Sequence, residues 1–280
     1  MSALLKGENH DLDITDCIHN QFPPHGLLAP DQSTQEAWQT MARSYVTIPR
    51  LVRLVRELQA SPKNETEPEI VDLAQHLYDT TIDPNFLLEA SSLGQLWEVR
   101  ASLEEVADVI PTSYGFKSRK LASLLVMYWM SRLLICGLVD KLLCTLPTTA
   151  QYFDAHAVEA EDVHLATEVL KMVQYGFTLS PDVDSDTVRI GQLQVLSLLQ
   201  LAFGSWHRVE KHAMASMQEG SKEETESKIQ SASSMKQLCL DLGNKLMIGM
   251  HLPLMTMSSI EVVSEMFAGG PLVQCDLHEI

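Results

Sequence analysis

The chain has 280 residues, of which 45% are apolar and 20% charged, so it is suited to fold around a sizeable core. Its 37 acidic residues outnumber its 20 basic ones, and the formal net charge of −17 disfavours direct binding to DNA or RNA by this chain alone. Five cysteines without a CxxC pair indicate a reducing compartment without disulfides.

Apolar residues recur at three- and four-residue spacing along most of the chain, and no strand pattern is visible. Pro49 is expected to interrupt or kink the first helix. The segments 180–186 and 221–226 are expected to be an acidic loop and a charged, mobile connection. We expect helices at residues 31–60, 69–79, 113–146, 157–179, 187–217, 228–249 and 256–267, and a further one that starts at Asp83-Pro84.

The stretch 113–146 is apolar around nearly its whole circumference, which indicates a helix buried on all sides. Residues 121–139 are long enough to span a bilayer, and a membrane span is the alternative. Because Arg132 would lie near the bilayer centre at a high cost, we expect a core helix and no membrane.

Together these patterns predict an all-α fold, a single helical domain of about eight to ten helices around the central buried helix 113–146. We expect an irregular N-terminal segment over residues 1–30, because its prolines break any helix there. The helical domain covers 31–271 and a tail covers 272–280.

No catalytic, cofactor-binding or metal-ligating residue is predicted. His207 and His212 are five residues apart and diverge on a helix, so they do not chelate one metal together. The acidic spacing at 182–186 lacks the glycine and glutamate of an EF-hand loop. The sequence has no GxSxG elbow, GxGxxG or phosphate-binding loop, and no DDxxD helix face of the kind that terpene cyclases use.

Two further groups of residues are expected to stabilise the fold rather than to bind a ligand. Glu159, Glu161 and Asp162 are interpreted as acidic residues that favour a helix start through the helix dipole. Trp206 and Arg208 could stack on a planar ligand, but the preferred interpretation is that Trp206 packs inward. A ligand pocket between the central helix and helix 187–217 is the alternative expectation, and its lining would be Trp129, Arg132, Trp206 and Arg208.

Three segments, supported by helix 37–58, carry a resemblance to a known family: 107–142, 199–212 (LQLAFGSWHRVEKH) and 262–271 (VVSEMFAGGP). In order and spacing they resemble the regulatory region of fungal binuclear zinc-cluster transcription factors. The matching positions are Pro111, Thr112, Ser113, Tyr114, Tyr128, Trp129, Met130, Cys136, Gly137, Leu138, Gly204, Trp206, Arg208, Phe267, Gly269, Gly270 and Pro271.

The resemblance implies a transcriptional regulator or co-regulator that resides in the nucleus, and in part in the cytoplasm, and controls a metabolic gene cluster, for example one of secondary metabolism. The family's six-cysteine zinc cluster and basic linker do not occur in this sequence, so its DNA binding is carried over to no residue. An upstream zinc module outside this sequence is one explanation.

We expect the chain to act through protein–protein association, with a full-length zinc-cluster factor or co-regulator as partner, or as a homodimer. An exposed apolar face on helix 37–58 is the expected contact, formed by Trp38, Leu51, Leu54 and Val55. The alternatives are a module that senses a small-molecule effector and an orphan all-α enzyme of the cyclase type.

Overall fold

The computed structural model describes residues 32–60, 67–80, 119–176, 185–216 and 222–270. Within these residues the chain forms seven α-helices and one short 3-10 helix, and no strand, so the predicted all-α class is confirmed. The helix predicted from Asp83 lies outside the described residues. The elements are α3 (Gln32–Ala60), α4 (Glu67–Asp79), α7 (Arg119–Thr145), η1 (Pro147–Gln151), α8 (Ala155–Gly176), α9 (Ser185–Ser216), α10 (Lys222–Gly249) and α11 (Met257–Phe267).

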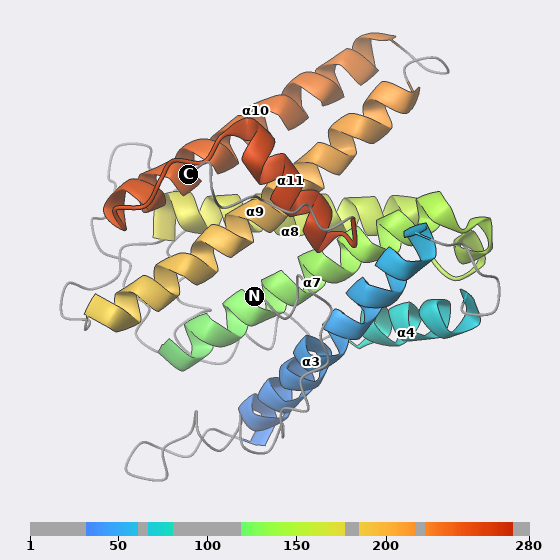
Figure 1. Ribbon diagram of the computed structural model, residues 1–280, viewed down its shortest axis with the longest axis horizontal. Helices are drawn as coiled ribbons and strands as arrows, with labels where there is room; N and C mark the ends of the chain where they lie inside the picture. The colour runs from blue at the N-terminus through green and yellow to red at the C-terminus, as the bar shows by residue number, and fades with distance from the viewer. Residues whose placement is uncertain (1–31, 61–66, 81–118, 177–184, 217–221, 271–280) are drawn as a thin grey trace.

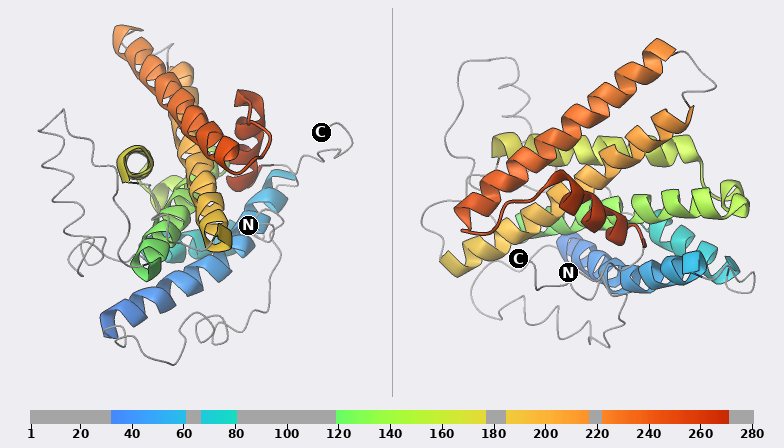
Figure 2. Two further views of the ribbon diagram at one scale, coloured as in Figure 1. Left: turned by 90° about the vertical axis from the view of Figure 1, so that its left-hand side faces the viewer. Right: turned by 45° about the horizontal axis from the view of Figure 1, so that its top comes forward.

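Helix α7 occupies the centre of the molecule, as its apolar circumference predicts. Every residue from Tyr128 to Val139 is buried. Helices α3 and α4 cover one side of α7, whereas α8 and α9 pack against the other side (Figures 1 and 2). In the described part of the chain, no helix is sufficiently long and apolar to cross a bilayer.

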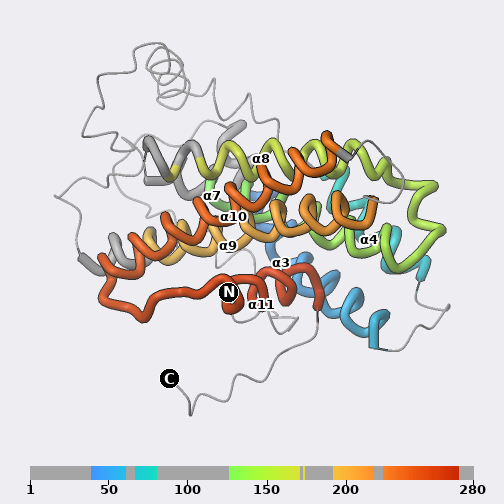
Figure 3. Tube along the Cα trace, turned by 90° about the horizontal axis from the view of Figure 1, so that it is seen from above, coloured from blue at the N-terminus to red at the C-terminus, as the bar shows by residue number. Residues whose placement is uncertain are grey.

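Helix α9 is the second hub, because it contacts α7, α8, α10 and α11. Helix α10 returns along the outside of α9 as the second arm of a helical hairpin, and α11 lies across α9 (Figures 1 and 3). The interior is one continuous apolar cluster, and its largest fully buried side chain is Phe203 of α9.

Local sequence explains the starts of α10 and α11. Thr256 caps α11 through a capping box, in which its hydroxyl accepts from the Ser259 amide and the Ser259 hydroxyl accepts from the Thr256 amide. One predicted boundary was wrong. Helix α10 begins at Lys222, where Glu223 and Glu224 suit a helix N-terminus, so the connection predicted over 221–226 is largely helical.

The interruption expected at Pro49 does not occur, because α3 continues through this residue. A proline inside a helix costs about 3 kcal/mol or more, because it removes a hydrogen bond and crowds the preceding turn. The residues around it, Ile48, Leu51 and Val52, are almost completely buried in the core. Burial of this apolar face therefore outweighs the local preference for a break.

The apolar face predicted on helix 37–58 is not exposed. Leu51, Leu54 and Val55 are buried inside the domain, and the side chain of Trp38 lies outside the described residues. The prediction was wrong for these three residues because the domain's own helices cover the stripe. Six large apolar side chains of the described residues are exposed instead, among them Tyr152 and Met214. The other four belong to the end of α10, the segment after it and the N-terminal part of α9, and we call this group the α10-end patch: Leu193, Ile248, Leu252 and Leu254.

The turn after α11 closes the domain onto its first described helix. Gly269 adopts a φ of +81°, which L-amino acids with a side chain rarely adopt. A Cβ at this position would lie 2.8 Å from Cγ1 of Val55, inside van der Waals contact. Beside this contact, Arg56 Nε donates a 3.0 Å hydrogen bond to the carbonyl oxygen of Gly270. The C-terminal turn is therefore fixed both by backbone conformation and by contact with α3.

We predict that Gly269→Ala lowers the free energy of unfolding by about 1–3 kcal/mol, because the new methyl group meets both the positive φ and Val55. Gly249→Ala is the matched control, since no atom lies within 4 Å of a Cβ there. It should change stability by less than about 1 kcal/mol. Urea unfolding followed by circular dichroism measures both, and equal losses would contradict the assigned role of Gly269.

Candidate functional site

Three ion pairs between helices centre on the first turns of α8. Three of its carboxylates each bind a cation from a different neighbouring helix, α10, α7 or α9. The pairs are Glu159–Lys228, Glu161–Arg132 and Asp162–Arg208. This arrangement corrects the helix-dipole interpretation of the acidic cluster, because the carboxylates join helices rather than merely favour a helix start.

The Asp162–Arg208 pair is the most enclosed of the three. Arg208 Nη2 lies 2.6 Å from Asp162 Oδ2, and the Ser205 hydroxyl donates a 2.7 Å hydrogen bond to Asp162 Oδ1. Burial raises the pKa of Asp162 above its usual value, although the guanidinium of Arg208 acts in the opposite direction. Both carboxylate oxygens are hydrogen-bonded, so the pair is built to hold α8 against α9.

Arg132 explains how a charge is accommodated in the middle of the apolar α7. Its side chain is only 3% exposed. It binds Glu161, donates from Nη1 to the backbone carbonyl of Tyr78 at 2.7 Å, and lies with its guanidinium carbon 4.8 Å from the centre of the Tyr78 ring. The residue therefore joins α7 to both α8 and α4.

The structure places the four residues of the predicted pocket in different surroundings. Trp129 is buried in the core, and Arg132 and Arg208 are occupied by carboxylates of α8. Trp206 packs inward, as its preferred interpretation predicted, and is 7% exposed. Of the four, Trp206 alone is among the residues of the cleft described next.

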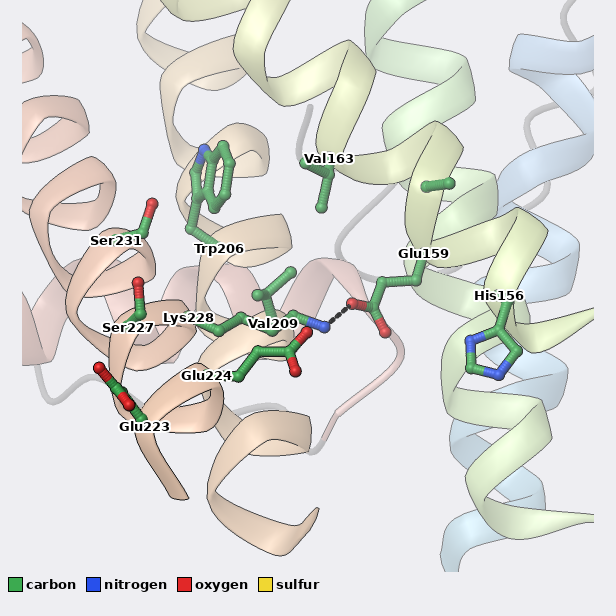
Figure 4. Close-up of a pocket in the computed structure, with 11 residues that line it drawn as sticks. His156, Glu159, Val163, Trp206, Val209, Glu223, Glu224, Ser227, Lys228 and Ser231 are labelled. Atoms are coloured by element: carbon green, nitrogen blue, oxygen red, sulfur yellow. Dashed lines mark hydrogen bonds and ion pairs between the residues drawn. The ribbon is translucent and has the colours of Figure 1, made fainter. Parts of the chain in front are cut away.

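A cleft of about 900 Å³ lies between α8, α9 and α10 (Figure 4). Its wall on α9 includes Trp206, whose indole Nε1 is buried and has no hydrogen-bond partner in the described structure. A buried donor without an acceptor is unfavourable by about 1–3 kcal/mol, which makes it a candidate contact for a ligand. The lining residues are His156, Glu159, Ala160, Val163, Trp206, Val209, Glu223, Glu224, Ser227, Lys228 and Ser231.

Sequence reasoning missed the contribution of α10 to this cleft. Ser227, Lys228 and Ser231 lie on one face of α10, and Figure 4 shows Lys228 reaching toward Glu159 of α8. The available signal was their three- and four-residue spacing, which places them on one helix face. Nothing in the sequence indicates that this face lies opposite Glu159, because that pairing depends on how α10 docks.

Glu159 belongs to two groups at once. One of its oxygens accepts from Lys228 at the cleft, and the other lies 3.8 Å from Nδ1 of His212 on α9. The interaction with His212, together with that of Lys228, lowers the pKa of Glu159 to about 2, and the same contact with Glu159 raises the pKa of His212. The negatively charged carboxylate of Glu159 therefore lies between the cleft and His212.

A second charged group lies on the other side of α9. Lys236 of α10 is buried, and its Nζ lies 2.7 Å from Glu210 of α9 and 3.2 Å from Glu261 of α11. His207 lies in the same group, with Nδ1 3.4 Å from Lys236 Nζ, and burial lowers its pKa. His207 and His212 therefore face different groups, in agreement with the divergence predicted from their spacing.

The segments that carry the family resemblance meet around Arg208. A Cβ on Gly137 of α7 would lie 3.0 Å from Arg208 Nη1. A Cβ on Gly204 would lie 3.1 Å from Cβ of Ser264 on α11 and 3.4 Å from Arg208 Nη1. Small residues on α7 and α9 thus leave room for this side chain where α7, α9 and α11 meet. The matching positions 111–114 and 271 lie outside the described residues.

Comparison of the chain with protein-family models, with curated proteins and with solved structures finds no match in any of the three.

We predict that Asp162→Asn lowers the free energy of unfolding by about 3–5 kcal/mol, because the charge of Arg208 is then buried without its counter-charge. The control is Glu57→Gln, which removes an exposed pair with Arg53 at 3.8 Å and should cost less than about 1 kcal/mol. Urea titrations of both variants measure the free energy of unfolding. Similar losses would show that the buried pair stabilises the fold no more than the exposed pair does.

Proposed function

We propose that the chain is a nuclear transcriptional regulator or co-regulator, related to the regulatory half of fungal zinc-cluster factors, which acts by binding another protein. The observation that carries this proposal is the meeting of the three resembling segments at Arg208. Gly137 and Gly204 have a packing reason to be small there, so the shared pattern corresponds to one helix junction and not to scattered apolar residues. The genes of a secondary-metabolite cluster are the proposed target.

The α10-end patch is the proposed contact surface. Ile248 and Leu254 are 62% and 59% exposed, and Leu193 and Leu252 lie in the same group. Exposed apolar side chains that group together on a folded domain are typical of protein-binding surfaces.

The net charge of the chain favours one class of partner. At −17, the chain repels a second copy of itself and attracts a basic protein. The basic linker that follows the zinc cluster in full-length members of the family provides such charge. We therefore propose a full-length zinc-cluster factor as the partner, and the homodimer becomes an outcome of the test.

The proposed role is not enzymatic. The three α8 carboxylates that face neighbouring helices are each bound to a cation, so none of them is free to act as a general base or to hold magnesium.

We predict that the full chain, fused to an unrelated DNA-binding domain in a fungal nucleus, changes the expression of a reporter gene. The double variant Ile248→Glu/Leu254→Glu should reduce this change about tenfold or more, because each charge replaces an apolar contact at the proposed surface. Met214→Glu is the matched control, since Met214 is 52% exposed on α9 away from the patch.

The fusion assay and light scattering of the purified chain together test the proposal. No effect of the fusion on the reporter, or equal effects of the patch variant and the control, would contradict it. A stable homodimer in light scattering would replace the heterologous partner with a second copy of the chain.

A second candidate function, sensing of a small molecule, is favoured by the buried and unpartnered Nε1 of Trp206 at the cleft. A cleft of about 900 Å³ falls in the size range of small-molecule sites. Its lining combines hydroxyls of α10 with the charges of Glu159 and Lys228, which suits a polar, planar metabolite.

For this second function, we predict that a screen of metabolites by thermal shift finds a ligand that stabilises the chain. At 100 times its dissociation constant, the ligand adds about 2.7 kcal/mol. Trp206→Phe should weaken its binding up to about tenfold through loss of one hydrogen bond. Ser234→Ala, on α10 outside the cleft, should leave affinity unchanged. A ligand that binds the Trp206→Phe variant as tightly as the unchanged chain would contradict the assignment of its site to this cleft.

A further inference from the structure

Three potential metal ligands meet between the C-terminal parts of α7 and α9. Asp140 and Cys144 are four residues apart on α7 and so share one face of that helix. His212 of α9 lies opposite them, and one ligand atom from each of the three residues lies within 4.8 Å of the others.

The geometry is close to what a zinc ion requires. Zinc bonds of about 2.0–2.3 Å in a tetrahedron place neighbouring ligand atoms about 3.3–3.6 Å apart. His212 Nε2 and Asp140 Oδ1 are already 3.3 Å apart. Cys144 is a free and exposed thiol, so rotation about its Cα–Cβ bond can bring the sulfur closer. An imidazole, a thiolate and a carboxylate form a set that zinc accepts, with a fourth position open to water.

The outer contact of His212 supports the same assignment. A histidine that binds a metal through one ring nitrogen commonly donates the N–H of the other to a carboxylate. This contact orients the ring and fixes its tautomer. Nδ1 of His212 lies 3.8 Å from Oε2 of Glu159, and Glu159 is itself held by Lys228. This leaves Nε2 of His212, the nitrogen next to Asp140, for the metal.

Charge and access also fit a divalent ion. Asp140 and a Cys144 thiolate would contribute two negative charges and His212 none, which balances Zn²⁺. Burial and the neighbouring Asp140 raise the pKa of the Cys144 thiol, so the metal must displace its proton on binding. Cys144 is exposed and His212 is about one-third exposed, so solvent and metal can reach the site.

We propose that Asp140, Cys144 and His212 bind one zinc ion that joins α7 to α9, with Glu159 as the residue that positions His212. The two histidines 207 and 212 do not act together in this site. The other two ligands, Asp140 and Cys144, lie on α7, whereas His212 lies on α9. The spacing of residues along the sequence therefore does not reveal the site. The site is independent of the proposed regulatory function, and its test uses metal binding alone.

The test titrates the purified, metal-free full chain with Zn²⁺ and with Co²⁺, which reports thiolate ligation through a charge-transfer absorption band. We expect one equivalent to bind, with the thiolate band and a higher melting temperature. Cys144→Ser should abolish the band, and His212→Gln should weaken binding at least tenfold. The double variant Cys17→Ser/Cys275→Ser, which removes cysteines elsewhere in the sequence, should retain both the band and the affinity.

A pair of variants at Glu159 tests its positioning role. Glu159→Gln should lower zinc affinity about 10–100-fold while the thiolate band remains. Lys228→Met removes the contact that holds Glu159 but leaves the Glu159 carboxylate beside His212, so it should lower affinity less than Glu159→Gln does. Absence of stoichiometric binding, or a thiolate band that survives Cys144→Ser, would overturn the site. Equal effects of the two variants would overturn the role of Glu159.

Discussion

The ion pair between Asp162 and Arg208 is the interaction on which the arrangement of the helices depends. Arg208 crosses from α9 toward α8, and its guanidinium occupies space that Gly137 and Gly204 leave open. A charge in this position is tolerated only while its partner is present, because an uncompensated buried charge is far more costly than an empty apolar contact. The spacing of α7, α8 and α9 is thus set by one guanidinium and the small residues around it.

The ion pairs of α8 have a consequence for specificity as well as for stability. Carboxylates at positions 159, 161 and 162 leave α8 in different directions and reach three helices, so a rotation or shift of α8 would break all three pairs at once. An apolar interface tolerates small shifts much better. We infer that α8 fixes the relative register of its neighbours, whereas the apolar core provides most of the driving force for folding.

The sequence predicted the features that depend on local pattern, and missed those that depend on docking. The burial of α7, the inward packing of Trp206 and most helix ends follow from periodicity and capping. The stripe of Leu51, Leu54 and Val55 was predicted correctly as apolar but wrongly as exposed. An apolar stripe has the same sequence pattern whether the chain's own helices or another protein cover it. Likewise, Cys144 and His212 are unremarkable alone, and only the packing of α7 on α9 brings them together.

The contact between Gly269 and Val55 joins residues that are more than two hundred positions apart in the sequence. Contacts over such separations form late, because most of the intervening chain must first be ordered. During synthesis, Val55 and Arg56 remain uncovered on this side until the turn after α11 has left the ribosome. The nascent domain therefore presents an apolar surface for nearly the whole of its translation, and this period is when it most needs protection by chaperones.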